Sequence, residues 1–318
     1  MARPRMVSGR GALGLMGAVA AGVLVLGASV APTAQARISC AYAGPPDNVL
    51  TVRASGFASG VIRRAGDEIV VHEFLAPRRR CGGSTPSVLN TDTIQVILRE
   101  NATANLNLRD GPFAPGATPE TDGEPEIEVE FRGFIAQVSV SGTPGADEFQ
   151  WLPGGAYGGL NLNPVTGDQD VDATLKGRYS FMVAAGAEGN DRIVPAGGAR
   201  IPNPYGPGVF SQGGRGDDFL AAPASGAILQ GGPGEDVLRG ARSDDAIYAG
   251  EGSDRLFGAA GPDRLVGGRG RDLIVGGPGR DRVNAHDGRR DIVRCGAGRD
   301  HVRADRRDRL RGCEFIRP

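Results

Sequence analysis

Aspartates recur every nine residues in the second half of the chain, each inside a glycine-rich segment. From Gly231 the sequence runs GGPGEDVLR, GARSDDAIY, AGEGSDRLF, GAAGPDRLV, GGRGRDLIV and GGPGRDRVN. The aspartates of these units are Asp236, Asp245, Asp254, Asp263, Asp272 and Asp281. Carboxylates are hard oxygen ligands of the kind that Ca²⁺ takes, together with carbonyl oxygens. Their fixed spacing makes them candidate ligands for a row of metal sites.

The same phase continues on both sides of these units, with small slips in spacing. The further aspartates are Asp147, Asp191, Asp218, Asp291, Asp300 and Asp308. Two residues after each aspartate stands an apolar side chain, and these are Phe149, Ile193, Leu220, Leu238, Ile247, Leu256, Leu265, Ile274, Val283, Val293, Val302 and Leu310. Low-complexity disorder, the alternative for a glycine-rich segment, would not keep two residue types in phase. The pattern therefore favours a folded repeat.

These units resemble the hemolysin-type (RTX) nonapeptide G-G-x-G-x-D-x-U-x. The resemblance covers Gly213 to Val302, with a fringe back to about Gly142. It implies an all-β fold with a C-terminal parallel β-roll, in which each unit is a glycine-rich turn followed by a short strand. Two units make one coil of eighteen residues. Carboxylates and turn carbonyls are expected to point outward between coils and to hold Ca²⁺, the implied cofactor, so that folding depends on calcium.

A coil of this length places the aspartates on two edges of the roll. One edge stacks Asp218, Asp236, Asp254 and Asp272, and the opposite edge stacks Asp245, Asp263 and Asp281. The predicted metal ligands are Asp191, Asp218, Asp236, Asp245, Asp254, Asp263, Asp272, Asp281, Asp291 and Asp300.

Some positions depart from the pattern. Ala227 stands where an aspartate is due, and Arg200 and Val209 fall at two further phases within a proline-rich stretch. Those positions are expected to lack ions, and the stretch is expected to form a loop. Arginines such as Arg255 and Arg264 offer an alternative to calcium, because they could neutralise the aspartates directly. Exposed ion pairs contribute only about 0–1 kcal/mol each, so calcium is favoured.

The N-terminus has the pattern of a targeting segment. Arg3, Arg5 and Arg10 precede an apolar run over 13–30, and Ala-Gln-Ala follows at 34–36. We expect a Sec-type signal peptide at residues 1–36, with a membrane anchor as the alternative, and no transmembrane span in the mature chain. The familiar RTX toxins and proteases lack such a leader. The chain looks more like the Sec-exported calcium-binding repeat proteins of high-G+C bacteria, which implies a secreted, extracellular bacterial protein.

Four cysteines are present, namely Cys40, Cys81, Cys295 and Cys313. An even count in an exported chain predicts two disulfide bonds, for which three pairings exist. The pairing Cys40–Cys81 with Cys295–Cys313 is favoured because each pair lies within one compositional region. Zinc binding is the disfavoured alternative, since the chain has no C-x-x-C motif.

Residues 37–135 lack the nine-residue phase and are expected to form a small N-terminal β domain. Segments 48–52, 67–74, 92–99 and 124–135 are rich in valine and isoleucine and predict strands. This region is predicted either as a separate sheet or as a degenerate start of the same roll. A transitional segment with one degenerate repeat (136–185) follows, and then the roll with its C-terminal cap (186–318). The aspartates at 168, 170 and 172 are expected to form a polar turn, with a calcium loop as the alternative.

Composition and motifs restrict the function. Glycine is 52 of 318 residues against a usual share of about 7%, and aromatics are 5%, which disfavours a helical bundle or a doubly wound enzyme. A net charge of −1 disfavours a nucleic-acid partner. No zincin, P-loop or G-x-S-x-G motif occurs. We therefore expect no enzyme but a secreted calcium-binding protein with a structural, adhesive or cell-surface role. A secreted hydrolase with an unmarked N-terminal site is the alternative.

The last residues, 288–318, are rich in arginine. They are expected to cap the roll, because terminal repeats are usually atypical. Binding of cell-wall polymers or of another surface partner is the alternative for this segment.

Overall fold

Every regular element in the described part of the chain is a β-strand. The computed structural model describes residues 37–56, 58–73, 81–87, 91, 93–99, 101–109, 128–152, 159–161, 173–195 and 208–317, and Gln35–Pro318 form one compact unit. Within these ranges no helix is long and apolar enough to cross a membrane. The expected signal peptide (1–36) and the turn at 168–172 lie outside the described residues. The predicted all-β fold class is confirmed.

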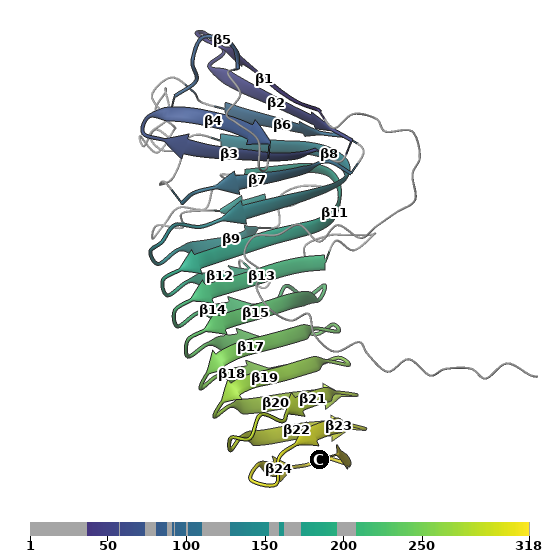
Figure 1. Ribbon diagram of the computed structural model, residues 1–318. Coiled ribbons are helices and arrows are strands. Elements are labelled where there is room, and N and C mark those ends of the chain that lie inside the picture. Colours follow the sequence, from purple (N-terminus) through teal and green to yellow (C-terminus); the bar gives the residue numbers. More distant parts are fainter. Residues whose placement is uncertain are drawn as a thin grey trace, which may run out of the picture. The chain divides into compact units, whose positions relative to one another are not determined.

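The C-terminal roll is built from two parallel ladders of alternate strands (Figure 1). The first ladder contains β9 (Glu148–Leu152), β12 (Arg192–Pro195), β14 (Phe219–Ala221), β16 (Val237–Arg239), β18 (Arg255–Phe257), β20 (Leu273–Gly279), β22 (Ile292–Gly298) and β24 (Arg309–Arg311). The second ladder contains β11 (Ala173–Glu188), β13 (Gly208–Arg215), β15 (Ala227–Pro233), β17 (Ala246–Gly252), β19 (Arg264–Gly270), β21 (Arg282–Ala285), β23 (His301–Ala304) and β25 (Phe315–Arg317).

Register partners in the central coils are eighteen residues apart, as the repeat predicts. Leu238 pairs with Leu256 in the first ladder, and Ile247 pairs with Leu265 in the second. Upstream, β13 continues the second ladder, with Val209 buried opposite Ala227. The expected loop is therefore wrong for this part of the stretch, because the strand supplies the ladder between β11 and β15.

N-terminal strands extend the stack. Four long strands pair in parallel in the order β2 (Val49–Ser55), β6 (Thr93–Leu98), β8 (Glu128–Ser141) and β11. β3 (Ser59–Ala65) and β7 (Thr103–Asn107) lead in parallel to the second half of β8. The remaining strands are antiparallel or short, namely β1 (Arg37–Ala43), β4 (Glu68–Glu73), β5 (Gly82–Gly83) and β10 (Gly159–Asn161).

This arrangement joins the N-terminal sheet to the roll by continuous parallel pairing. Two arrangements were expected for residues 37–135, a separate sheet or the start of the roll. The strand pairings describe the second, because they run without a break into the roll. The predicted boundaries after residues 135 and 185 fall inside β8 and β11. The division into domains itself stays a prediction.

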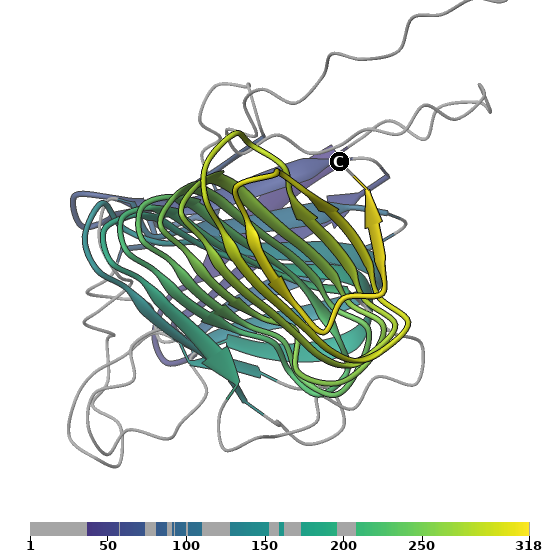
Figure 2. The ribbon, with the colours of Figure 1, turned by 90° about the horizontal axis from the view of Figure 1, so that it is seen from below.

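Inward side chains of both ladders form one continuous apolar core. The predicted inward residues from Ile193 to Val302 are all 4% exposed or less. Figure 2 shows the coils lying over one another around this core. Each coil buries two large aliphatic side chains, and each such burial stabilises the fold by roughly 1.5–3 kcal/mol. No single coil can bury its own residues, so the stack is cooperative.

Glycines allow the coils to approach closely at the turns. Gly250 has a φ of +132°, and a Cβ added there would collide with the carbonyl oxygen of Gly232 on the preceding coil. Only glycine meets both requirements without strain.

Both disulfide bonds favoured from the sequence are present. Cys40 in β1 is bonded to Cys81, which adjoins β5, and β1 and β5 are themselves paired. Cys295 in β22 is bonded to Cys313, between β24 and β25. The second bond closes the final coils of the roll.

Replacing Leu256 with alanine should lower the free energy of unfolding by about 2–5 kcal/mol, because the side chain is fully buried in the stacked core. Urea unfolding in the presence of Ca²⁺, followed by circular dichroism, measures this loss. Leu273→Ala is the control, since Leu273 is half-buried on the outer side of the neighbouring strand. The control should lose about 1 kcal/mol or less. Equal losses would contradict the assigned inward register.

Candidate metal centre

The repeat aspartates form two hydrogen-bonded columns at the turns. The backbone N–H of Asp236 donates to Oδ1 of Asp254 at 2.8 Å, and that of Asp245 donates to Oδ1 of Asp263 at 2.9 Å. The first column contains Asp147, Asp191, Asp218, Asp236, Asp254, Asp272, Asp291 and Asp308. The second contains Asp245, Asp263, Asp281 and Asp300. The structure thus brings the predicted aspartates together in the two groups that an eighteen-residue coil requires.

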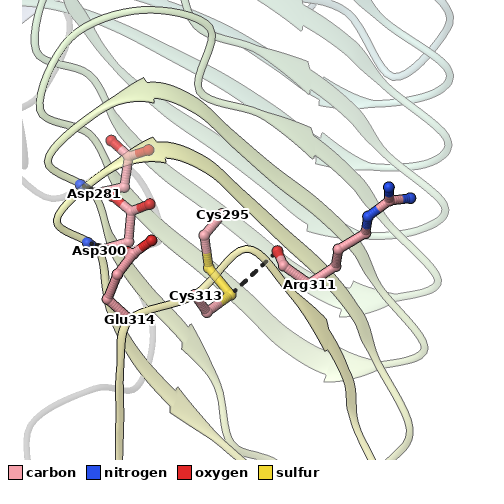
Figure 3. The surroundings of a disulfide bond; sticks show 6 residues. All are labelled: Asp281, Cys295, Asp300, Arg311, Cys313 and Glu314. Carbon is pink, nitrogen blue, oxygen red and sulfur yellow. Dashed lines mark hydrogen bonds between the residues drawn. A yellow bond between two sulfur atoms is a disulfide. The ribbon is translucent and has the colours of Figure 1, made fainter.

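Residues other than aspartate close both ends of the second column. At its start the N–H of Ala227 donates to Asp245 Oδ1 at 2.7 Å, so the alanine occupies an aspartate position without supplying a carboxylate. At its end Asp300 N donates to Glu314 Oε2 at 3.0 Å. Figure 3 shows Asp281, Asp300 and Glu314 stacked in this order beside the Cys295–Cys313 bond.

The predicted ligands are buried, with exposed fractions of 0–3%. The expectation that they point outward is therefore wrong, whereas their contacts do run between the coils, as expected. The reason is the hydrogen bond from the preceding coil: Oδ1 has to reach a backbone N–H, and this contact holds the carboxylate against the turn.

The second carboxylate oxygen has no hydrogen-bond partner in nine of the ten predicted ligands. These atoms are Oδ2 of Asp191, Asp218, Asp236, Asp254, Asp263, Asp272, Asp281, Asp291 and Asp300. Asp245 is the exception, because the N–H of Ala241 donates to its Oδ2 at 2.7 Å. A buried charged oxygen without a partner is costly, and a cation would satisfy it.

A backbone carbonyl of the adjacent coil accompanies the unpaired oxygen. A Cβ added at Gly258 would lie 2.5 Å from Asp263 Oδ2 and 2.6 Å from the carbonyl oxygen of Gly276. The first glycine of a repeat therefore stays bare because a carboxylate and a carbonyl from two coils converge over it. Among the described residues, no three His, Cys, Asp or Glu side chains gather at one point. Carbonyl oxygens of the turns would thus complete a ligand set, which fits the oxygen chemistry of Ca²⁺.

Burial also controls the charge of these groups. Loss of water raises the pKa of Asp254 to about 7, and the neighbouring carboxylates of Asp272 and Asp236 add to the increase. Burial likewise raises the pKa of Asp263 to about 7 and that of Asp236 to about 6. The columns therefore disfavour their own negative charge unless a cation compensates it.

The arginines do not supply that compensation. Arg255, Arg264 and Arg282 are exposed, and the guanidinium of Arg264 lies over the ring of Tyr248 at 5.8 Å. In the ranges that the structure covers, no ion pair joins an arginine to a column aspartate. Direct neutralisation by arginine, the alternative drawn from the sequence, is not what the structure shows.

A second acidic network near the C-terminus was missed from the sequence. Asp287 Oδ2 accepts the N–H of Gly270 at 2.8 Å, and Asp305 Oδ2 accepts the N–H of Asp287 at 2.9 Å. The nine-residue register excludes Asp287 and Asp305, because it runs through the aspartates of the two columns, such as Asp281 and Asp291. Their own separation of eighteen residues is the signal that would have found them.

A comparison with protein families identifies the repeats. The model of the RTX calcium-binding nonapeptide repeat, in its four-copy form, matches residues 230–265 and 257–292. These are RTX calcium-binding repeats. The RTX segment includes the turns of Asp236, Asp254 and Asp263, where unpaired oxygens are buried. RTX repeats bind Ca²⁺ as a structural ligand. The individual ligands from Asp191 to Asp300 stay predictions. Neither the curated proteins nor the solved structures compared with the chain give a match.

Acidification should stabilise the RTX roll when Ca²⁺ is removed by a chelator. The folded-state pKa values of about 6 to 7 lie above the value of about 3.9 for an unfolded aspartate. Folding therefore takes up protons, so stability rises as the pH falls through 7 toward 4 and is lost as the pH rises. Circular dichroism of the chelated protein between these pH values should show increasing β content. With Ca²⁺ present the trend should reverse, because protons compete for the ligands. A chelated protein that loses structure on mild acidification would contradict this account.

Proposed function

We propose that this chain is a secreted protein whose roll folds around Ca²⁺ outside the cell and serves a structural or adhesive role at the cell surface. The observation that carries the proposal is the series of nine buried Oδ2 atoms without partners, repeated at coil spacing. A bound cation at each turn would satisfy those oxygens and offset the repulsion between neighbouring carboxylates. Calcium then acts as a part of the fold.

Secretion is supported by three features. RTX repeats and disulfide bonds are typical of extracellular proteins. The leader pattern at residues 1–36 fits Sec export, as in the exported repeat proteins of high-G+C bacteria. Calcium sites of extracellular modules often bind in the range of about 10⁻⁴–10⁻³ M, so the roll would fold after leaving the cell.

A binding role is proposed in place of catalysis. The chain has three histidines, and each of them contacts a different neighbour. His72 contacts the carbonyl of Glu73 in β4, His286 lies 3.0 Å from Asp305, and His301 stacks on Phe315 in the second ladder. Each of these contacts is accounted for by local structure, which supports a non-enzymatic role.

Calcium titration of the chelated full-length protein should raise its β content and its melting temperature, because cation binding favours only the folded roll. Circular dichroism follows both quantities, and chelator should reverse both. Mg²⁺ serves as the control cation, since it demands a smaller and more regular oxygen shell. A folded roll that is indifferent to calcium would defeat the proposal.

Asp263→Asn should act in opposite directions with and without calcium. Asparagine keeps an oxygen that can accept the N–H of Asp245 but removes the negative charge. In chelator the variant should be more stable than the parent, since it no longer buries a group that resists ionisation. In Ca²⁺ it should need several-fold more calcium to fold.

Asp244→Asn is the matched control, because it removes the same charge from an exposed position near the same turn. Its calcium midpoint should stay close to that of the parent. Calcium titrations of the three proteins in parallel make the comparison. Equal shifts for both variants would show that net charge, and not a ligand role of Asp263, sets the calcium response.

A further inference from the structure

The outer side of the second ladder carries a strip of positive charge near the C-terminal end of the roll. We call it the basic strip, and its members are Arg264, Arg282, Arg303 and Arg317, with His301 lying among them. Arg264, Arg282 and His301 are consecutive register partners, and Arg303 pairs with Arg317 in the next row. Neighbouring strands lie about 4.8 Å apart, so the basic side chains follow one another closely.

Acids are absent from the outer positions of these four strands. Val266, Asn284 and Phe315 occupy the other positions of these two rows. Arg269, further along β19, is exposed and paired with Glu251 of β17. All four arginines of the strip are exposed, and no ion pair of the described residues involves them. Like charges on directly opposite strand positions are destabilising, so the strip favours an anionic partner.

The nearest carboxylates are engaged by the backbone. Asp263, Asp281 and Asp300 immediately precede Arg264, Arg282 and His301, but their side chains are buried in the second column. Glu314, which precedes Phe315, is an exposed residue whose Oε2 accepts the N–H of Asp300. With the calcium of the proposed function bound, the charge of these aspartates is compensated as well. The inference therefore rests on the calcium-loaded roll, in which the four arginines face solvent and no ion pair of the described residues involves them.

Each aromatic ring beside the strip already has one face in contact with a neighbouring side chain. Arg264 lies over Tyr248, and the ring of His301 stacks on Phe315 with centroids 4.8 Å apart and an interplanar angle of 14°. Single-stranded nucleic acids rely on bases stacked on free aromatic faces. This surface would therefore recognise a partner by a series of negative charges and not by stacking on flat bases.

We propose that the basic strip binds a linear polyphosphodiester without bases, of the poly(polyol phosphate) type found in extracellular polymers. Guanidinium groups match phosphate oxygens in a bidentate manner, and the parallel ladder presents them in two neighbouring rows, with Arg264 and Arg282 in one and Arg303 and Arg317 in the other. This partner gives the proposed adhesive role a defined chemistry.

Binding of the full-length protein to immobilised poly(glycerol phosphate) in saturating Ca²⁺ tests the proposal. The double variant Arg282→Gln/Arg303→Gln should weaken binding about tenfold, because it removes two exposed ion pairs between arginine and phosphate groups of the polymer. The matched control is Arg255→Gln/Arg309→Gln, which removes the same charge from the outer side of the first ladder. The control should bind within about twofold of the parent, and Arg282→Lys/Arg303→Lys should fall between the parent and the glutamine pair.

Circular dichroism of every protein in the same buffer separates the two proposals. A parent protein that folds in Ca²⁺ but does not bind the polymer would overturn the basic strip alone. Equal loss of binding in the strip variant and in the control variant would also overturn it, because the overall positive charge of the roll would then explain the binding without a specific strip. Tighter binding to single-stranded DNA of equal charge would replace the polyol phosphate with a nucleic acid. A parent that does not respond to Ca²⁺ would overturn the proposed function and this inference with it.

Discussion

The hydrogen bond from a backbone N–H to the aspartate of the next coil organises this structure. It occupies one carboxylate oxygen, buries the side chain beneath the turn and leaves the other oxygen facing a carbonyl of the adjacent coil. The same contact thus specifies the register of the stack and creates the demand for a cation. In the proposed function, structural stability and calcium affinity are therefore two aspects of one arrangement, and a change at a column aspartate is expected to alter both.

Much of this arrangement could be predicted because the sequence period is also the structural period. Nine residues per unit determine which aspartates share an edge and which apolar residues share the core, so Leu238 and Leu256, or Asp236 and Asp254, are assigned by counting. The Cys295–Cys313 bond follows from the same count, since the two cysteines are one coil apart. Four N-terminal strands were also predicted from their composition, although β1, β3, β7 and β11 were not.

Other features depend on atoms that a period does not describe. The inward turn of the carboxylates results from a backbone donor on the neighbouring coil, and the exception at Asp245 results from one N–H of Ala241. Continuity between the N-terminal strands and the roll depends on pairings such as β8 with β11, which no repeat marks. The N–H of Asp287 donates to Asp305 Oδ2 outside the nine-residue phase, so a register that follows the repeat aspartates does not find this second acidic network.

The disulfide bond at the end of the roll has a mechanical consequence. A pull on the C-terminus passes through β25 to Cys313 and from there directly to Cys295 in β22. The intervening chain, including β24, carries none of that load, so the last coils cannot unravel strand by strand from this end. Rupture would have to begin with the separation of β22 from β20, which are paired in parallel from Ile292 to Gly298. The bond therefore keeps the last coils attached to one another when the C-terminus is pulled.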